Sequence, residues 1–215
     1  MSTITIEEQQ RIASWLDEHP VLAVGLGNRE QACSIAAINL ALSGEMTDDI
    51  PECMSPTIGK WIIQVQDTMP AEIRNSAEWR GLLPLAAGTG REHEEQRRAV
   101  VLDWMWGTVL PSLQGLADER GFGREWRTMT AERTPESALA AREAAREAEW
   151  ANAAWAAADA ARADAAADAA WAAWAAAAWA AWAAADAAAA AWAGFDPCGL
   201  LKRLIETGDT EGTNE

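Results

Sequence analysis

One segment limits the possible folds of this chain more than any other. From 138 to 193 there is no glycine or proline, and alanine fills 37 of the positions. Alanine has the highest helix propensity of all residues. Thr134 is a typical N-cap, Pro135 stands at the first helical position, and Glu136 suits the positive end of a helix dipole. The sequence therefore predicts one long helix, with Gly194 just beyond its end.

The predicted helix is too long for the rest of the chain to cover. At about 1.5 Å per residue it measures roughly 88 Å, whereas a compact domain of about 130 residues is roughly 35 to 40 Å across. The helix must protrude, bend back or pack on another copy. Two consecutive eight-residue repeats, 171–178 and 179–186, also allow the simpler interpretation of low-complexity expansion.

Most tryptophans of this segment fall on one side of the predicted helix. At 100° per residue, six of them share an arc of about 140°, together with three aspartates. A buried Trp removes about 150 to 250 Å² from water, so an uncovered arc would aggregate. We expect the N-terminal domain, a second subunit or a partner to cover it. The aspartates are either solvated or indole-bonded acids at its edge, or ligands for a cation. This Trp face consists of Trp150, Trp171, Trp174, Trp179, Trp182, Trp192, Asp164, Asp168 and Asp186.

The first 133 residues predict a series of helices. Thr5 and Glu8 form a capping-box pair that starts a helix over 6–18. Asn28 is the expected cap of a second helix, which Gly44 ends. Ser55 followed by proline starts a third helix. Residues 21–24 form the one extended run, which is too little for a sheet.

A further helix is predicted from Pro70, with an interruption at Pro84. Others are predicted over 91–110, over 111–119, and after the glycines at 121 and 123. The class is therefore all-α. The predicted divisions are a helical domain over 1–133, the long helix over 134–194, a short amphipathic helix over 195–206 and a disordered tail over 207–215.

Charge and cysteine content limit the partners. The net charge of −16 repels phosphate backbones and anionic lipids, which excludes direct nucleic-acid binding. No membrane span is expected, because the 17 uncharged residues of 169–185 are mostly alanine and are bracketed by aspartates. Cys33, Cys53 and Cys198 are widely spaced and predict reduced, buried thiols. The N-terminus has no apolar signal segment, so we expect a cytoplasmic protein.

Two weaker patterns concern ligands. Gly88, Thr89, Gly90 and Arg91 precede a helix, where N–H groups and an arginine can bind a small anion; Arg29 is a further candidate for the same role. A plain turn is the alternative. His93 lies among glutamates but lacks the spacing of a zinc motif, so the sequence predicts no metal, cofactor or catalytic residue.

Several motifs together resemble a family of uncharacterised proteins from phages and bacterial prophage regions. They are residues 31–42, 47–56, 74–80, 87–91 and 102–106, and the end at 196–201. The resemblance implies a helical front, an Ala and Trp tract of variable length, and a bacterial cytoplasm as the setting. It brings no activity.

The leading interpretation is thus a non-enzymatic interaction protein that uses the Trp face for self-association or partner binding. Two alternatives stay open. One is a binder that sequesters a small ligand in an indole-lined pocket. The other is an α-helical metal-dependent hydrolase that uses His93.

Overall fold

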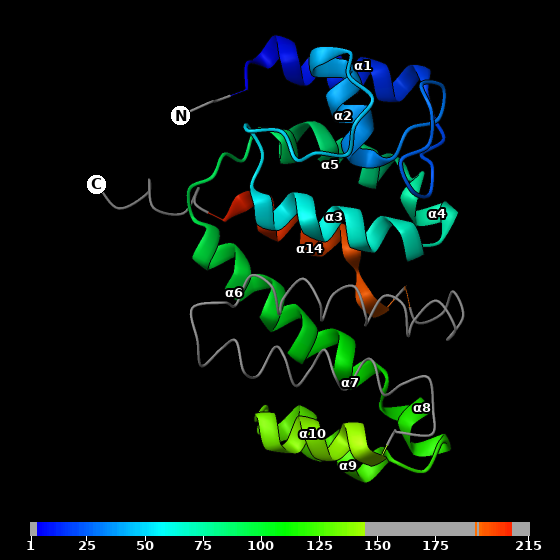
Figure 1. Ribbon diagram of the computed structural model, residues 1–215, viewed down its shortest axis with the longest axis vertical. Helices are drawn as coiled ribbons and strands as arrows, with labels where there is room; N and C mark the ends of the chain where they lie inside the picture. Colours follow the sequence, from blue (N-terminus) through cyan, green and yellow to red (C-terminus); the bar gives the residue numbers. More distant parts are fainter. Residues whose placement is uncertain (1–3, 145–191, 193, 208–215) are drawn as a thin grey trace. The chain divides into compact units, whose positions relative to one another are not determined.

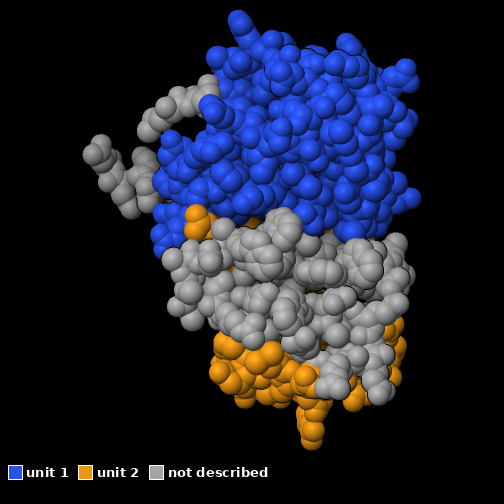
Figure 2. Space-filling view, in the orientation of Figure 1, with its two compact units in different colours: residues 1–97, 197–215 blue, residues 98–196 orange. Residues whose placement is uncertain are grey.

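The computed structural model describes residues 4–144, 192 and 194–207. Within these residues the structure is helical, and the only bridge between extended segments joins Gly27 to Ala32. The all-α prediction is confirmed. Two compact units are present (Figure 2): unit 1 comprises 1–97 and 197–215, and unit 2 comprises 98–196. This division differs from the predicted change of domain at 133, which followed composition.

Unit 1 is a packed group of helices (Figure 1). Helix α5 packs against α1, α2 and α14, while α3 contacts α2 and α14. Trp61 of α3 and Trp79 of α5 meet in the core, with ring centroids 5.8 Å apart, and Trp79 Nε1 donates to Ser34 Oγ over 3.2 Å. Its helices are α1 (Ile6–Glu18), α2 (Ser34–Ser43), α3 (Pro56–Thr68), α4 (Ala71–Arg74), α5 (Ala77–Ala87), the first residues of α6 (Glu94–Trp104), and α14 (Pro197–Glu206).

Several helix ends form where local signals predicted them. Thr5 and Glu8 make the full capping box at the start of α1. Ser55 caps α3 by accepting from the N–H of Ile58. Gly44 ends α2 in the left-handed conformation, with a φ of 76°. These signals act within one turn of the chain, so the sequence is enough to identify them.

The predicted role of Asn28 is wrong. Helix α2 begins six residues later, and the side chain of Cys33 accepts the capping hydrogen bond from Ala36 N–H. The Asn28 side chain accepts instead from the N–H groups of Glu30 and Gln31. Asparagine serves equally well as a helix cap and in such a local turn, and here the turn is formed.

Pro84 does not interrupt a helix as predicted. Helix α5 continues through it to Ala87, and the residues Leu83, Pro84 and Ala86 are all buried. Burial of this apolar face outweighs the hydrogen bond that proline removes.

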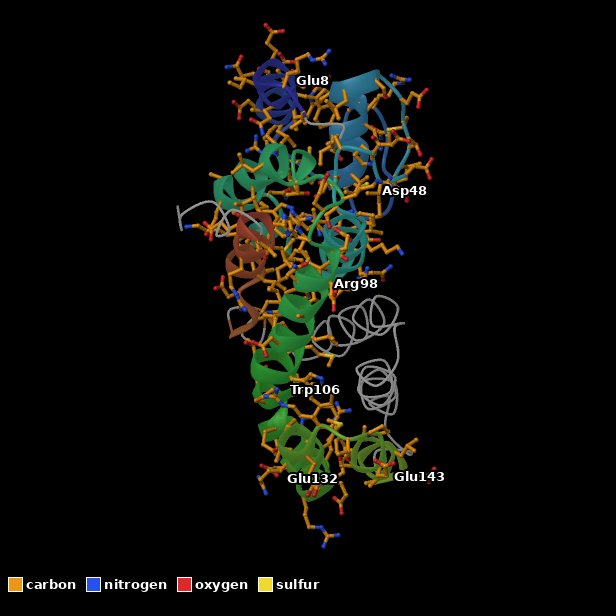
Figure 3. The ribbon with its side chains drawn as sticks, turned by 90° about the vertical axis from the view of Figure 1, so that its left-hand side faces the viewer. Glu8, Asp48, Arg98, Trp106, Glu132 and Glu143 are labelled. Atoms are coloured by element: carbon orange, nitrogen blue, oxygen red, sulfur yellow. The ribbon has the colours of Figure 1, made fainter. Side chains whose placement is uncertain are left out.

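The helix predicted over 91–110 is not regular throughout. It begins at Glu94, and a wide π-helical turn, Met105–Val109, follows α6. Trp106 lies in this turn (Figure 3), and the N–H of Leu110 bonds to the carbonyl of Met105. Pro111 supplies no N–H to the carbonyl of Gly107, so the ordinary α-helical pattern cannot continue there.

Unit 2 contains the rest of α6, α7 (Leu110–Ser112), α8 (Gln114–Glu119), α9 (Gly123–Glu132) and α10 (Pro135–Ala144). Helices α9 and α10 pack together, joined through Arg133, which has a φ of 54°. Trp126 of α9 is fully buried and donates through Nε1 to the carbonyl of Leu110 over 2.8 Å. Trp104 donates to the carbonyl of Phe195 over 2.6 Å, which fixes the end of the Ala and Trp tract within this unit.

The predicted long helix begins as expected at Pro135, with Ser137 N–H donating to Thr134 Oγ1. It is described as far as Ala144, and residues 145–191 and 193 lie outside the described residues, as does the predicted tail from 208. Gly194 is not the predicted stop, because it and Phe195 are helical. The left-handed residue is Asp196, with a φ of 45°; burial of Phe195 accounts for the extra helical residues.

Candidate functional site

A group of polar contacts surrounds Glu94, a half-buried residue at the start of α6. Its carboxylate accepts from the hydroxyl of Ser55, and from both the N–H and the hydroxyl of Thr57, over 3.0 and 2.8 Å. Ser55 and Thr57 stand at the N-terminus of α3, where a helix dipole favours a negative charge. The carboxylate thus occupies the place that an external anion would take at this helix end.

Arg97, one turn further along α6, is buried and forms an ion pair with Glu94 over 3.3 Å. Its Nε donates to the carbonyl of Leu204 over 3.1 Å, and one Nη donates to that of Thr207 over 3.4 Å. These carbonyls end α14, where a helix dipole favours positive charge. The pair Glu94 and Arg97, here called the helix-end pair, therefore joins the start of α3 to the end of α14.

The loop before α6 is held by the same arginine. Arg97 donates to the carbonyls of Thr89 and Glu92, over 3.0 and 2.5 Å. The hydroxyl of Thr89 in turn accepts from Ser55 N–H over 3.0 Å. The polar groups of the helix-end pair therefore serve to hold main-chain segments together.

The predicted anion-binding loop has little capacity left for an anion. The N–H groups of Gly88, Thr89 and Gly90 donate to the carbonyls of Leu85, Ala86 and Cys53 respectively. Arg91 is exposed and reaches the carbonyl of Glu52 over 3.4 Å. Arg29 is exposed on the loop that precedes α2. The bonds of Gly88 and Thr89 are those of a local turn, whereas that of Gly90 joins this segment to the loop before α3.

A second buried arginine has a similar structural task. Arg74, at the end of α4, donates to the carbonyls of Leu22, Gln66 and Met69 over 3.1, 3.1 and 2.8 Å. It fixes the segment after α1 to the end of α3. Sequence reasoning missed both Arg74 and Arg97, because their acceptors are main-chain carbonyls up to 110 residues away, which leave no local pattern.

The Trp face lies mostly outside the described residues. This applies to Trp150, Trp171, Trp174, Trp179, Trp182, Asp164, Asp168 and Asp186. Trp192 is the exception within the described part of the chain, and it is 2% exposed. Its ring packs edge-on against Phe195, with centroids 5.5 Å apart. This tryptophan is therefore covered by the protein itself.

All three cysteines lie within the described residues. Cys33, Cys53 and Cys198 are buried and none is in a disulfide, as predicted. Burial raises the pKa of the Cys33 and Cys53 thiols above the ordinary value. In the described part of the chain, no three His, Cys, Asp or Glu side chains gather as a metal site would require.

Helices in that part also lack the length and apolar character needed to cross a bilayer.

Comparison with protein families, with characterised proteins and with solved structures finds no match to this chain. Function must therefore be inferred from the chain's own residues.

Proposed function

We propose that this chain is a non-enzymatic interaction protein whose Trp face pairs with another helix, first of all that of a second copy. The feature that carries the proposal is the spacing of the tryptophans in an alanine-rich segment, which predicts that six of them share one helix face. Trp192 is covered by the protein itself, so the other five are the candidate contacts. Alanine on the opposite side permits close helix approach, at the short end of the usual 8 to 10 Å. Aromatic side chains are also the residues that dominate protein interfaces.

The described residues support a scaffold role for unit 1. Its buried arginines, Arg74 and Arg97, donate to helix-end and loop carbonyls, and the half-buried Glu94 accepts at the start of α3. Such bonds order the chain by joining segments that lie far apart in sequence. The resemblance to phage and prophage proteins adds a setting to the proposal, a bacterial cytoplasm in which small accessory proteins act by binding other molecules.

The test uses substitutions in the full chain rather than a truncation, because α14 belongs to unit 1. Trp171→Ala, Trp174→Ala, Trp179→Ala and Trp182→Ala are combined in one variant, which retains helix propensity. Trp155→Ala is the matched control, since this tryptophan lies outside the predicted arc. Sedimentation velocity over a range of concentrations should show that the combined variant loses assembly and that the control does not. Equal assembly of all three proteins would refute the role of the Trp face.

A further inference from the structure

The segment between α1 and α2, residues 20–33, presents apolar side chains to solvent. Val21 is 44% exposed, Val24 is 58% exposed and Leu26 is 40% exposed. They are three of the five large apolar side chains that are strongly exposed among the described residues, and they fall within six positions. Isolated exposed apolar residues are ordinary, but a group of this kind marks an interaction site. We call this segment the apolar loop.

The apolar loop has a defined conformation. Ala23 N–H donates to the carbonyl of Ala32 over 3.0 Å, and Cys33 N–H to that of Leu26 over 3.1 Å. The Asn28 turn described above closes its far end. Gly27 has a φ of 76°, a conformation that a side chain would strain. The loop therefore forms a small hairpin-like structure with internal hydrogen bonds.

Side chains of α3, α4 and the residue after α4 also hold the apolar loop in place through hydrogen bonds. The N–H of Gly25 donates to the carboxylate of Asp67, at the end of α3, over 2.9 Å. Leu22, which is buried, donates to the side chain of Asn75 over 2.8 Å and accepts from Arg74. Leu22 thus anchors the loop, with the exposed Val21 before it and the exposed Val24 and Leu26 after it. A partner would not have to order the loop on binding, which is a major cost of association.

The charges around the loop indicate which partner fits. Asp17 and Glu18 end α1 directly before the loop, and Glu30 lies on it next to Arg29; all four are exposed. Asp17 is paired with Arg80 of α5 over 3.5 Å, which leaves Glu18 and Glu30 as the acids that a partner can meet. We propose that the apolar loop docks an amphipathic helix of another protein, with apolar side chains against Val21, Val24 and Leu26 and Lys or Arg side chains facing the acids.

Charge also disfavours the other occupants. A second copy would bring the same acidic residues against this surface, and like charges placed together reduce affinity. Nucleic acid would meet a negative surface without the basic side chains that phosphate contacts require. A basic amphipathic helix satisfies both the apolar and the charged parts of the loop.

The experiment uses two synthetic peptides and the full isotope-labelled chain. The first peptide has about 18 residues, with Leu on one helical face and Lys on the other; the second replaces Lys by Glu. The amide resonances of residues 21–27 should shift with the Lys peptide only. The Val24→Ser/Leu26→Ser variant should bind about tenfold more weakly, the effect expected from removing interface anchors. Leu85→Ser is the matched control, because Leu85 is 47% exposed on α5, and it should bind like the wild type.

Four results would overturn this inference. Binding of both peptides with equal affinity would show that charge does not select the partner. Shifts spread over the whole acidic surface, or equal affinity of the loop variant, would show that the apolar side chains are not contacted. Loss of self-assembly in the loop variant would instead make a second copy the occupant. The variants' thermal unfolding should match the wild type, because the substituted side chains are exposed.

Discussion

Arg97 Nε donates to the main-chain carbonyl of Leu204 over 3.1 Å, although 107 residues separate them in sequence. The contact makes the C-terminal helix α14 part of the same unit as the first 97 residues. A chain cut at Arg133 would therefore lose a packed element of unit 1 together with the Ala and Trp tract. Residues 98–196 form an insertion into unit 1.

Removing Arg97 should destabilise the protein strongly. Arg97→Met leaves the half-buried Glu94 without its cation and four main-chain carbonyls without the donor that Arg97 supplies. Loss of one partner of a buried ion pair costs about 3 kcal/mol or more. Urea unfolding followed by circular dichroism measures the change. Arg97→Lys should recover only part of the loss, because one ammonium cannot reach the acceptors of a planar guanidinium. A loss below about 1 kcal/mol for Arg97→Met would contradict the role of the helix-end pair.

Helix α14 should contribute to the stability of unit 1 through its apolar side. Leu204 is fully buried, so Leu204→Ala should lower the free energy of unfolding by about 2 to 5 kcal/mol. Lys202 on the same helix is exposed, and Lys202→Ala should change it by less than about 0.5 kcal/mol. Equal effects of the two substitutions in urea unfolding would show that α14 is not packed as described.

Local sequence signals predicted much of this fold. The capping box of Thr5 and Glu8, the Ser55 cap and the glycine end at Gly44 all act within a few residues. Predictions failed where distant contacts or burial decided the outcome. Pro84 stays within a helix because that part of α5 is buried, and the helix continues past Gly194 through the buried Phe195.

The candidate site was less predictable than the fold. Arg97 and Glu94 stand in a run of charged residues that resembles any solvated helix start. Arg97 is buried and donates to the carbonyl of Leu204 in α14, a contact that no nearby residue indicates. For the apolar loop the sequence predicts only an extended run over 21–24, because the exposure of Val24 depends on which side of the loop unit 1 covers.

The capping box of α1 should give the protein a small acid-sensitive contribution to stability. Two hydrogen bonds from Thr5, the stronger influence from its N–H and the weaker from its hydroxyl, lower the pKa of the Glu8 carboxyl. A lowered pKa in the folded state means that the contribution is complete above the ordinary Glu pKa of about 4.3 and is lost as pH falls through the lowered pKa. At pH 6 the Glu8→Gln variant should melt below the wild type. The difference should shrink as the pH falls below the ordinary Glu pKa and vanish where Glu8 is protonated in both the folded and the unfolded state. A difference that stays constant with pH would contradict the charged cap.

Cys33 should be unreactive in the folded protein. Its Sγ accepts from the N–H of Ala36 over 3.3 Å, and burial raises the pKa of the thiol, so little thiolate forms at pH 8. Iodoacetamide labelling, followed by peptide mass spectrometry, should be at least about a hundredfold slower than in urea, because reaction requires opening of the structure. Labelling of Cys33 in the native protein as fast as in urea would contradict its burial.

The central claim is that the Trp face joins two copies of the chain, and the absolute mass in solution tests it most directly. Light scattering on the full chain, eluted from a sizing column, should give a multiple of the 23.1 kDa chain mass. The variant lacking Trp171, Trp174, Trp179 and Trp182 should elute as a folded monomer. A wild-type mass of 23.1 kDa at every concentration would contradict self-association through this face.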